Sequence, residues 1–207
     1  MTFNPEIHHR RSIRLKEYDY SSAGAYFVTL CAFERECLFG EIVDGDMVLN
    51  ENGRIMLDCW VKIPKYFPTV ILDECIAMPN HFHGIIHISE SPVGAKQGVS
   101  ASPAFGLCGK QEQSQNQGEA GETLASSLPS GTISGALGAI IQNFKSVSTR
   151  RINKLRSNPG CPVWQRNYFE RVMRNEDNLL KAREYIFNNP MKWELDTENP
   201  INVQKNG

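Results

Sequence analysis

Two histidines, His81 and His83, stand two positions apart in the apolar run HFHGIIHI at 81–88. This composition predicts a β-strand, in which alternate side chains point to the same face. Both imidazoles should then project to one side, where they could form half of a metal site. A pair of strand histidines with only local hydrogen bonds is the alternative, because this spacing is common. His87 has the same parity but lies about 13 Å further along a strand that rises roughly 3.3 Å per residue, which is too far for the same ion.

A tyrosine and an asparagine near the other end of the chain form a second group. Residues 175–177 (Asn-Glu-Asp) predict the capped start of a helix that Pro190 ends. Tyr185 and Asn189 are four residues apart on this helix, so they share one face. A phenol can act as a nucleophile, and an amide oxygen can bind a hard cation. The structural alternatives are a packed aromatic ring for Tyr185 and a helix C-cap for Asn189.

The remaining pattern predicts the elements that position these residues. Strands are expected at 24–33, 70–77 and 81–88, with a hairpin at 38–49 and a last strand or irregular edge segment at 163–173. Helices are expected at about 50–66, 132–156 and 175–189. The short link Pro79–Asn80 predicts antiparallel pairing of the strands on either side.

Basic residues gather in two places, although 22 Lys and Arg against 23 Asp and Glu give a net charge of -1 and no overall nucleic-acid signature. The arm at 8–16 is basic, and the helix segment 145–156 holds five basic and no acidic residues. A frayed terminus and a solvated helix face are the ordinary explanations. The absence of Asp and Glu from residues 145–156 favours contacts with phosphate groups instead. The candidates are Arg10, Arg11, Arg14, Lys145, Arg150, Arg151 and Lys154.

The length and composition predict one domain at 8–195, interrupted by a flexible low-complexity insert at 90–131 that is rich in Gly, Ser, Gln, Ala and Pro. Six cysteines without a CxxC pair, no signal-peptide core and no apolar run of membrane-spanning length predict a cytoplasmic protein with reduced thiols and no membrane partner.

Several motifs together resemble a known family. The order His-Phe-His at 81–83 matches the HUH motif of single-strand nucleases. The runs MPNHFHGII at 78–86, WQRNYF at 164–169 and YIFNNP at 185–190 resemble the IS200-like Y1 (HUH) transposase family. Together with RRSIRL at 10–15 and YFVT at 26–29, they are most similar to the REP-associated tyrosine transposases. The resemblance covers residues 8–195 apart from the insert.

The resemblance implies an α+β fold of HUH endonuclease architecture, a ferredoxin-like or RRM-like antiparallel sheet with helices packed against it. It also implies Tyr185 as the nucleophile, and His81, His83 and Asn189 as ligands of a divalent ion, Mg²⁺ or Mn²⁺. The implied reaction is cleavage and transfer of single-stranded DNA beside REP-like hairpins through a 5′-phosphotyrosine. The expected protein is a bacterial, nucleoid-associated monomer or homodimer.

Two other functions fit parts of the pattern. A non-catalytic RRM-like module would bind single-stranded nucleic acid through exposed aromatics such as Tyr26 and Phe27. A replication or conjugation nickase would use the same chemistry as the transposase. Tyr168 and Tyr26 are the other positions at which a nucleophile is conceivable. A binder needs neither the metal nor Tyr185, whereas a nickase needs both.

Overall fold

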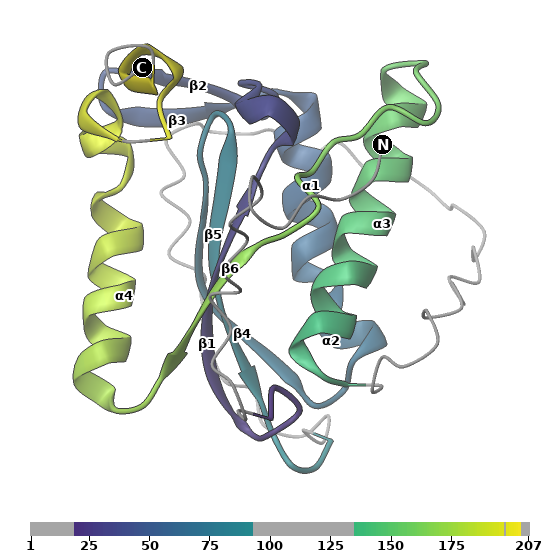
Figure 1. The fold of residues 1–207 in the computed structure, drawn as a ribbon, viewed down its shortest axis with the longest axis vertical. Coiled ribbons are helices and arrows are strands. Elements are labelled where there is room, and N and C mark those ends of the chain that lie inside the picture. Colours follow the sequence, from purple (N-terminus) through teal and green to yellow (C-terminus); the bar gives the residue numbers. More distant parts are fainter. Residues whose placement is uncertain (1–18, 93–134, 197, 204–207) are drawn as a thin grey trace, which may run out of the picture.

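The structure is a computed structural model that describes residues 19–92, 135–196 and 198–203 (Figure 1). Its elements, in chain order, are β1 (Gly24–Cys31), η1 (Phe33–Arg35), β2 (Gly40–Val43), β3 (Asp46–Leu49), α1 (Glu51–Val61), α2 (Ile63–Tyr66), β4 (Val70–Ala77), β5 (His81–Ile88), α3 (Leu137–Leu155), β6 (Phe169–Met173), α4 (Glu176–Asn188), η2 (Pro190–Leu195) and α5 (Pro200–Val203). The basic arm and nearly all of the predicted insert lie outside the described residues.

Four strands form the main sheet in the order β4-β5-β1-β6, and each neighbouring pair is antiparallel. Strands and helices alternate along the chain as β-α-β-β-α-β, followed by α4, which is the ferredoxin-like arrangement. The small hairpin β2–β3 forms a separate sheet. The predicted α+β class, the ferredoxin-like sheet and the antiparallel pairing of β4 with β5 are confirmed.

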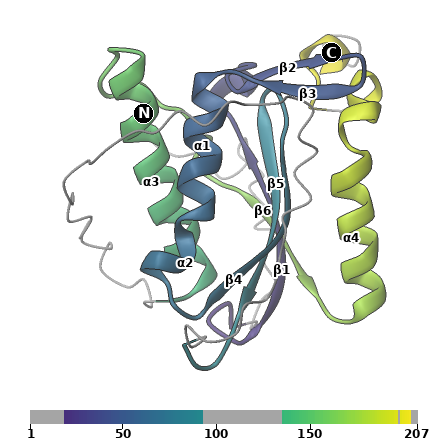
Figure 2. The same cartoon turned by 180° about the vertical axis from the view of Figure 1, so that it is seen from behind.

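Helices cover both faces of the main sheet. Figures 1 and 2 show α1, α2 and α3 on one side of it and α4 on the other. Alternate residues of β1 and β5 supply buried core side chains to the first side: Tyr26, Val28, Leu30, Phe82 and Ile86. Trp60 of α1 packs against Phe82 with ring centroids 4.6 Å apart and against Phe144 of α3 at 5.4 Å.

Glycine at position 84 allows this close packing. A Cβ atom there would lie 2.4 Å from the Trp60 ring, so the indole occupies the space of the missing side chain. Gly84 directly follows His81 and His83 in β5. The contact with Trp60 therefore also sets the distance between this part of the strand and α1.

The second face is held to α4 by a small apolar cluster and by an ionic contact. Ile85, Leu179 and Ile186 are the buried members of the cluster. Arg183 of α4 donates to both carboxylate oxygens of Asp73, from Nε at 3.0 Å and from Nη2 at 2.6 Å. Asp73 lies two residues after Ile71, which pairs with His87, so the alternation of β4 directs both side chains toward the face that α4 covers.

The structure refines two predicted boundaries. The helix expected at 50–66 is two helices, because Pro64 stands in the first turn of α2, where its missing N–H is tolerated. The segment 163–173 is a strand only from Phe169, and Trp164 forms an isolated bridge with Ala32. Gly53 lies inside α1, where a Cβ would come within 2.2 Å of the Phe39 carbonyl oxygen.

In the described part of the chain, no helix has the length and apolar character needed to cross a bilayer.

Candidate active site

His81 and His83 lie side by side at the start of β5, on the face that α4 covers. Their ring centroids are 4.7 Å apart, and the residues are 0% and 4% exposed. The register of β1 with β5 places Cys31 opposite His81 and Thr29 opposite His83. The prediction that the two imidazoles share one face is confirmed.

The side chain of Asn80 determines which His81 nitrogen carries the proton. Its Nδ2 donates to the carbonyl oxygens of Arg35 at 3.2 Å and Glu198 at 2.6 Å. Its Oδ1 therefore faces Nδ1 of His81 at 2.9 Å. Because an amide oxygen can only accept, Nδ1 of His81 must donate, and in the neutral ring the lone pair is then on Nε2.

His83 has a similar support on its Nδ1 side. This nitrogen lies 2.8 Å from Thr29 Oγ1, which can accept from an Nδ1–H. The ring stacks on Phe27 with centroids 5.3 Å apart. An outer hydrogen bond of this kind orients a metal-binding imidazole and leaves Nε2 for the ion.

Burial keeps both rings neutral at ordinary pH. Desolvation lowers the pKa of His81 to about 4, although the charge of Asp196 acts in the opposite direction. Burial, with a smaller effect of His81, holds the pKa of His83 well below its usual range. Neutral imidazole is the form that binds metal ions, so no proton has to be displaced at neutral pH.

Tyr185 of α4 reaches over this pair. Its ring lies edge-on to His83 with centroids 5.2 Å apart and to Phe27 at 6.0 Å, and the residue is 44% exposed. Burial raises the pKa of the Tyr185 phenol, and the Asn189 side chain opposes this shift. The phenol is thus protonated at neutral pH and is both open to solvent and next to the histidines.

Asn189 follows one turn later, between Tyr185 and Trp193. The Trp193 ring lies 6.0 Å from that of His81, so the residues flanking Asn189 contact both histidines. Asn189 is 3% exposed, and its Oδ1 has no hydrogen-bond partner.

Three buried polar atoms at this place lack hydrogen bonds, namely Nε2 of His81, Nε2 of His83 and Oδ1 of Asn189. Leaving buried acceptors unpaired costs free energy, so such a cluster needs an explanation. Two imidazole nitrogens and an amide oxygen are suitable ligands for a divalent ion, and the residues fit that group. No cluster of three or more His, Cys, Asp or Glu side chains within the described ranges could hold a metal, so the set depends on the amide.

The predicted DNA-contact residues of α3 differ in their surroundings. Lys145 is directed inward and donates to the carbonyl oxygens of Gln165 at 2.9 Å and Asn167 at 2.8 Å. Arg151 pairs with Asp58.

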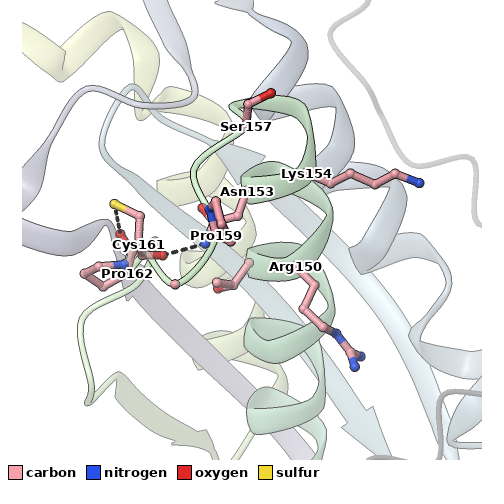
Figure 3. Close-up of a pocket in the computed structure, with 9 residues that line it drawn as sticks. Arg150, Asn153, Lys154, Ser157, Pro159, Cys161 and Pro162 are labelled. Atoms are coloured by element: carbon pink, nitrogen blue, oxygen red, sulfur yellow. Dashed lines mark hydrogen bonds between the residues drawn. The ribbon is translucent and has the colours of Figure 1, made fainter.

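Arg150 and Lys154 are exposed and have no ion pair with any described residue. They lie at a pocket at the end of α3 and point away from the Cys161–Pro162 wall (Figure 3). Contact of these four residues with DNA stays a prediction, as it does for Arg10, Arg11 and Arg14 outside the described residues.

The other two tyrosines considered as nucleophiles, Tyr26 and Tyr168, lie away from the histidine pair. Tyr26 is fully buried on the opposite face of the sheet, where its hydroxyl donates to the Ser22 carbonyl at 2.7 Å. The Tyr168 ring lies under the Lys145 ammonium, 5.5 Å from its centroid. Phe27 is half-buried between His83 and Tyr185. The idea of an open RRM-like platform displaying Tyr26 and Phe27 is therefore wrong, because α4 and the core cover these rings.

Sequence reasoning missed three residues of the site. Thr29 and Asn80 support the imidazoles, and Asp196 lies next to His81. Asn80 directly precedes His81 in the sequence, so this adjacency could have identified it as a residue that supports the site. Thr29 depends on the strand register and Asp196 on the packing of the C-terminal segment, and neither follows from local pattern.

Comparisons with known proteins find a sequence relative and several solved structures, two of which are given below. No family model matches the chain. A Haemophilus influenzae protein described as an uncharacterized protein is 41% identical over 194 residues, which cover 94% of this chain and 95% of that one. A REP-associated tyrosine transposase bound to a REP hairpin is 14% identical, with a TM-score of 0.49 over 88% of this chain and 73% of that one. A suspected transposase from Deinococcus radiodurans R1 is 13% identical, with a TM-score of 0.42 over 86% and 97%.

Proposed function

This chain belongs to the same family as the Haemophilus influenzae relative, and we propose that it is a metal-dependent tyrosine transposase. In this proposal it cleaves and rejoins single-stranded DNA beside a hairpin. It is a member of the IS200-like Y1 group, most similar to the REP-associated enzymes, as the sequence motifs at 78–86 and 185–190 indicate.

One observation carries the proposal. Three buried polar atoms without hydrogen bonds belong to His81, His83 and Asn189, and the half-exposed ring of Tyr185 contacts His83 one helical turn before Asn189. A structural role would explain a buried histidine with all its hydrogen bonds made, but not two buried Nε2 atoms without a hydrogen-bond partner. A cation bound there would account for the atoms without hydrogen bonds, and the nearby Tyr185 would be the nucleophile that acts with the cation.

The reaction is a transesterification at phosphorus. The Tyr185 hydroxyl oxygen attacks the phosphorus, the bond from phosphorus to the 3′ oxygen breaks, and that oxygen leaves as a 3′-OH after taking up a proton. The 5′ side remains bound to the protein as a phosphotyrosine, which keeps the ester bond energy for rejoining. When bound, the divalent ion polarises a non-bridging phosphate oxygen and orients the phosphate.

The protein residues prepare this step. His83 and Phe27 hold the Tyr185 ring in place, so that little conformational freedom is lost at the moment of attack. The raised pKa of Tyr185 means that its proton must leave during the attack. Asn189, which favours the deprotonated phenol, assists that loss.

The proposed substrate is single-stranded DNA with a REP-like hairpin. Arg150 and Lys154, which have no ion-pair partner among the described residues, are the best placed of the predicted cations to contact phosphates. A replication or conjugation nickase would share the chemistry, and the substrate distinguishes the two functions.

The test is an oligonucleotide assay with the full chain. Labelled single strands with and without a hairpin are incubated with Mn²⁺ or with EDTA and resolved on a denaturing gel. A covalent protein–DNA band that needs both the hairpin and the metal supports the transposase. Cleavage without hairpin preference supports a nickase, and binding without any cleavage would contradict both.

A further inference from the structure

The edge strand β6 places an exposed aromatic ring beside the candidate site. Phe169 pairs with Thr29 of β1, and Thr29 pairs with His83 of β5 on its other side. Directly opposite residues of an antiparallel pair have their side chains on the same face of the sheet, with Cβ atoms about 5 Å apart. Phe169 therefore lies on the face that carries the histidine pair, with β1 between its strand and that of His83.

The neighbours of Phe169 in β6 agree with this orientation. Met173 has the same parity and packs against the apolar cluster under α4. Tyr168 and Val172 have the opposite parity and pack against the core on the side of α1 and α3. Met173 lies at the end of β6 from which the chain enters α4, whereas Phe169 lies at the other end and is 53% exposed.

The two flanks of the histidine pair differ in their cover. On the β4 side, Ile76 pairs with His83 and packs in the cluster under α4. On the β6 side, the equivalent position holds the exposed ring of Phe169. A strand of DNA that reaches Tyr185 therefore has an open surface toward β6 and a covered one toward β4.

A cation accompanies the ring on this surface. A single exposed phenylalanine needs no explanation by itself. Arg171, however, has the same parity and lies about 7 Å further along β6. It is exposed and forms no ion pair with any described residue. An aromatic ring that stacks on a base and a cation that contacts the backbone are the two groups with which proteins bind single-stranded nucleic acid.

We propose that Phe169 stacks on a nucleobase of the single strand that Tyr185 attacks, and that Arg171 contacts a phosphate of the same strand. This inference rests on the proposed function and adds a substrate-positioning surface to it. Every nucleobase has a π face, so this contact positions the strand without selecting its sequence.

Equilibrium binding of labelled hairpin DNA with a single-stranded flank to the full-length protein in EDTA tests the proposal without metal or cleavage. Phe169→Ala should weaken binding by about tenfold to a hundredfold. It should leave the slope of log binding constant against log salt unchanged, because the ring carries no charge, whereas Arg171→Ala should lower the slope by about 1. Tyr66→Ala removes an exposed ring from α2, on the other face of the sheet, and should bind as wild type does.

Conservative variants separate stacking from apolar contact. Phe169→Tyr keeps the π face and should bind as wild type does. Phe169→Leu keeps apolar bulk without a π face and should lose most of the affinity that Phe169→Ala loses. Wild-type affinity in Phe169→Leu would overturn the stacking role.

A scan of abasic sites along the single-stranded flank locates the stacked base. Loss of the base at one position should weaken wild-type binding and have no further effect in Phe169→Ala, because both changes remove the same contact. Additive losses at every position would overturn the proposal.

A measurement on the wild type covers a variant that does not fold. When 5-iodouracil replaces the base at the located position, irradiation should crosslink it to Phe169, as mass spectrometry of the digested protein would show. Crosslinks that form only with other residues would overturn the proposal.

The same experiments distinguish the failure of this contact from that of the proposed function. Wild-type affinity in Phe169→Ala, with a covalent adduct still formed in Mn²⁺, would overturn the role of Phe169 and leave the proposed function intact. A wild-type protein that binds no single-stranded DNA would refute the proposed function and this contact with it.

Discussion

The ring of Tyr185 lies edge-on against the ring of His83, with centroids 5.2 Å apart and planes at 73°. One residue is on α4 and the other on β5, and 102 positions separate them in the chain (185 − 83). Among the described residues, Tyr185 is the tyrosine whose ring contacts the histidine pair, in which both Nε2 atoms are buried without a hydrogen-bond partner.

Tyr185→Phe should abolish the covalent protein–DNA adduct and preserve DNA binding, because only the hydroxyl is removed and the ring contacts with His83 and Phe27 stay. The measurement is a denaturing gel with labelled hairpin DNA and Mn²⁺, paired with a binding assay. Tyr168→Phe is the matched control and should form the adduct. An adduct present in Tyr185→Phe and absent in Tyr168→Phe would refute the assignment.

His81→Ala and His83→Ala should each reduce metal-dependent cleavage by at least about a hundredfold, since the lost polarisation of the phosphate is worth several kcal/mol. His81→Ala leaves the Asn80 Oδ1 without its donor and should cost about 1–3 kcal/mol of stability. Asn189→Ala should weaken cleavage less, because water can take one coordination position. Initial rates in Mn²⁺ and thermal melts check these expectations, and a wild-type rate in His81→Ala would exclude it as a ligand.

Asn80→Ala should weaken Mn²⁺ binding roughly tenfold to a hundredfold, because the variant lacks the amide oxygen that holds the His81 proton on Nδ1. The ¹⁵N shifts of the His81 ring report that tautomer directly, and they should show a mixture in the variant. Asn52→Ala, the matched control, loses a side-chain hydrogen bond to the Leu38 carbonyl away from the site and should keep wild-type affinity. Equal affinity in both variants would show that Asn80 has only a structural role.

Asp73→Asn should loosen α4, because it removes the paired acceptor of Arg183. Burial raises the pKa of Asp73, but hydrogen bonds from His87 and Arg183 outweigh it and hold that pKa well below its usual range. The contribution to stability is therefore complete above the unfolded pKa of about 3.9 and is lost as the pH falls toward the folded value.

Hydrogen exchange of the α4 amides and acid titration of the melting temperature test this anchor. The variant should exchange faster in α4 at neutral pH and lose less stability than wild type below about pH 4. The exposed turn variant Asp44→Asn should match wild type in both measurements. Unchanged α4 exchange in Asp73→Asn would show that the apolar cluster alone holds the helix.

Arg150→Ala and Lys154→Ala should each lower the slope of log binding constant against log salt by about 1, as expected for the loss of one phosphate contact. Arg151→Ala should change the slope less, because Asp58 already balances its charge. Filter binding of hairpin DNA over a range of salt concentrations measures the slopes. A larger change in the slope for Arg151→Ala than for Arg150→Ala would contradict this assignment and would indicate that DNA binds on the Arg151 side of α3.

The sequence predicted the parts of the site that local periodicity determines. The alternation of a strand brought His81 and His83 together, and the helical spacing put Tyr185 and Asn189 on one face. Partners that depend on tertiary packing were not predictable. Arg151 meets Asp58 across 93 positions, and Asp196 reaches His81 only because the C-terminal segment returns to β5. The burial of Tyr26 and Phe27 depends on which helices cover each face of the sheet, and no local sequence pattern determines that packing.

The contact between Gly84 and Trp60 has a consequence for how the sequence can vary. Any side chain at position 84 would collide with the indole and push β5 away from α1. His81 and His83 would move with the strand and lose their register with Thr29. We therefore expect substitutions at 84 and 60 to be coupled, so that a relative with a side chain at position 84 has a residue smaller than tryptophan at position 60.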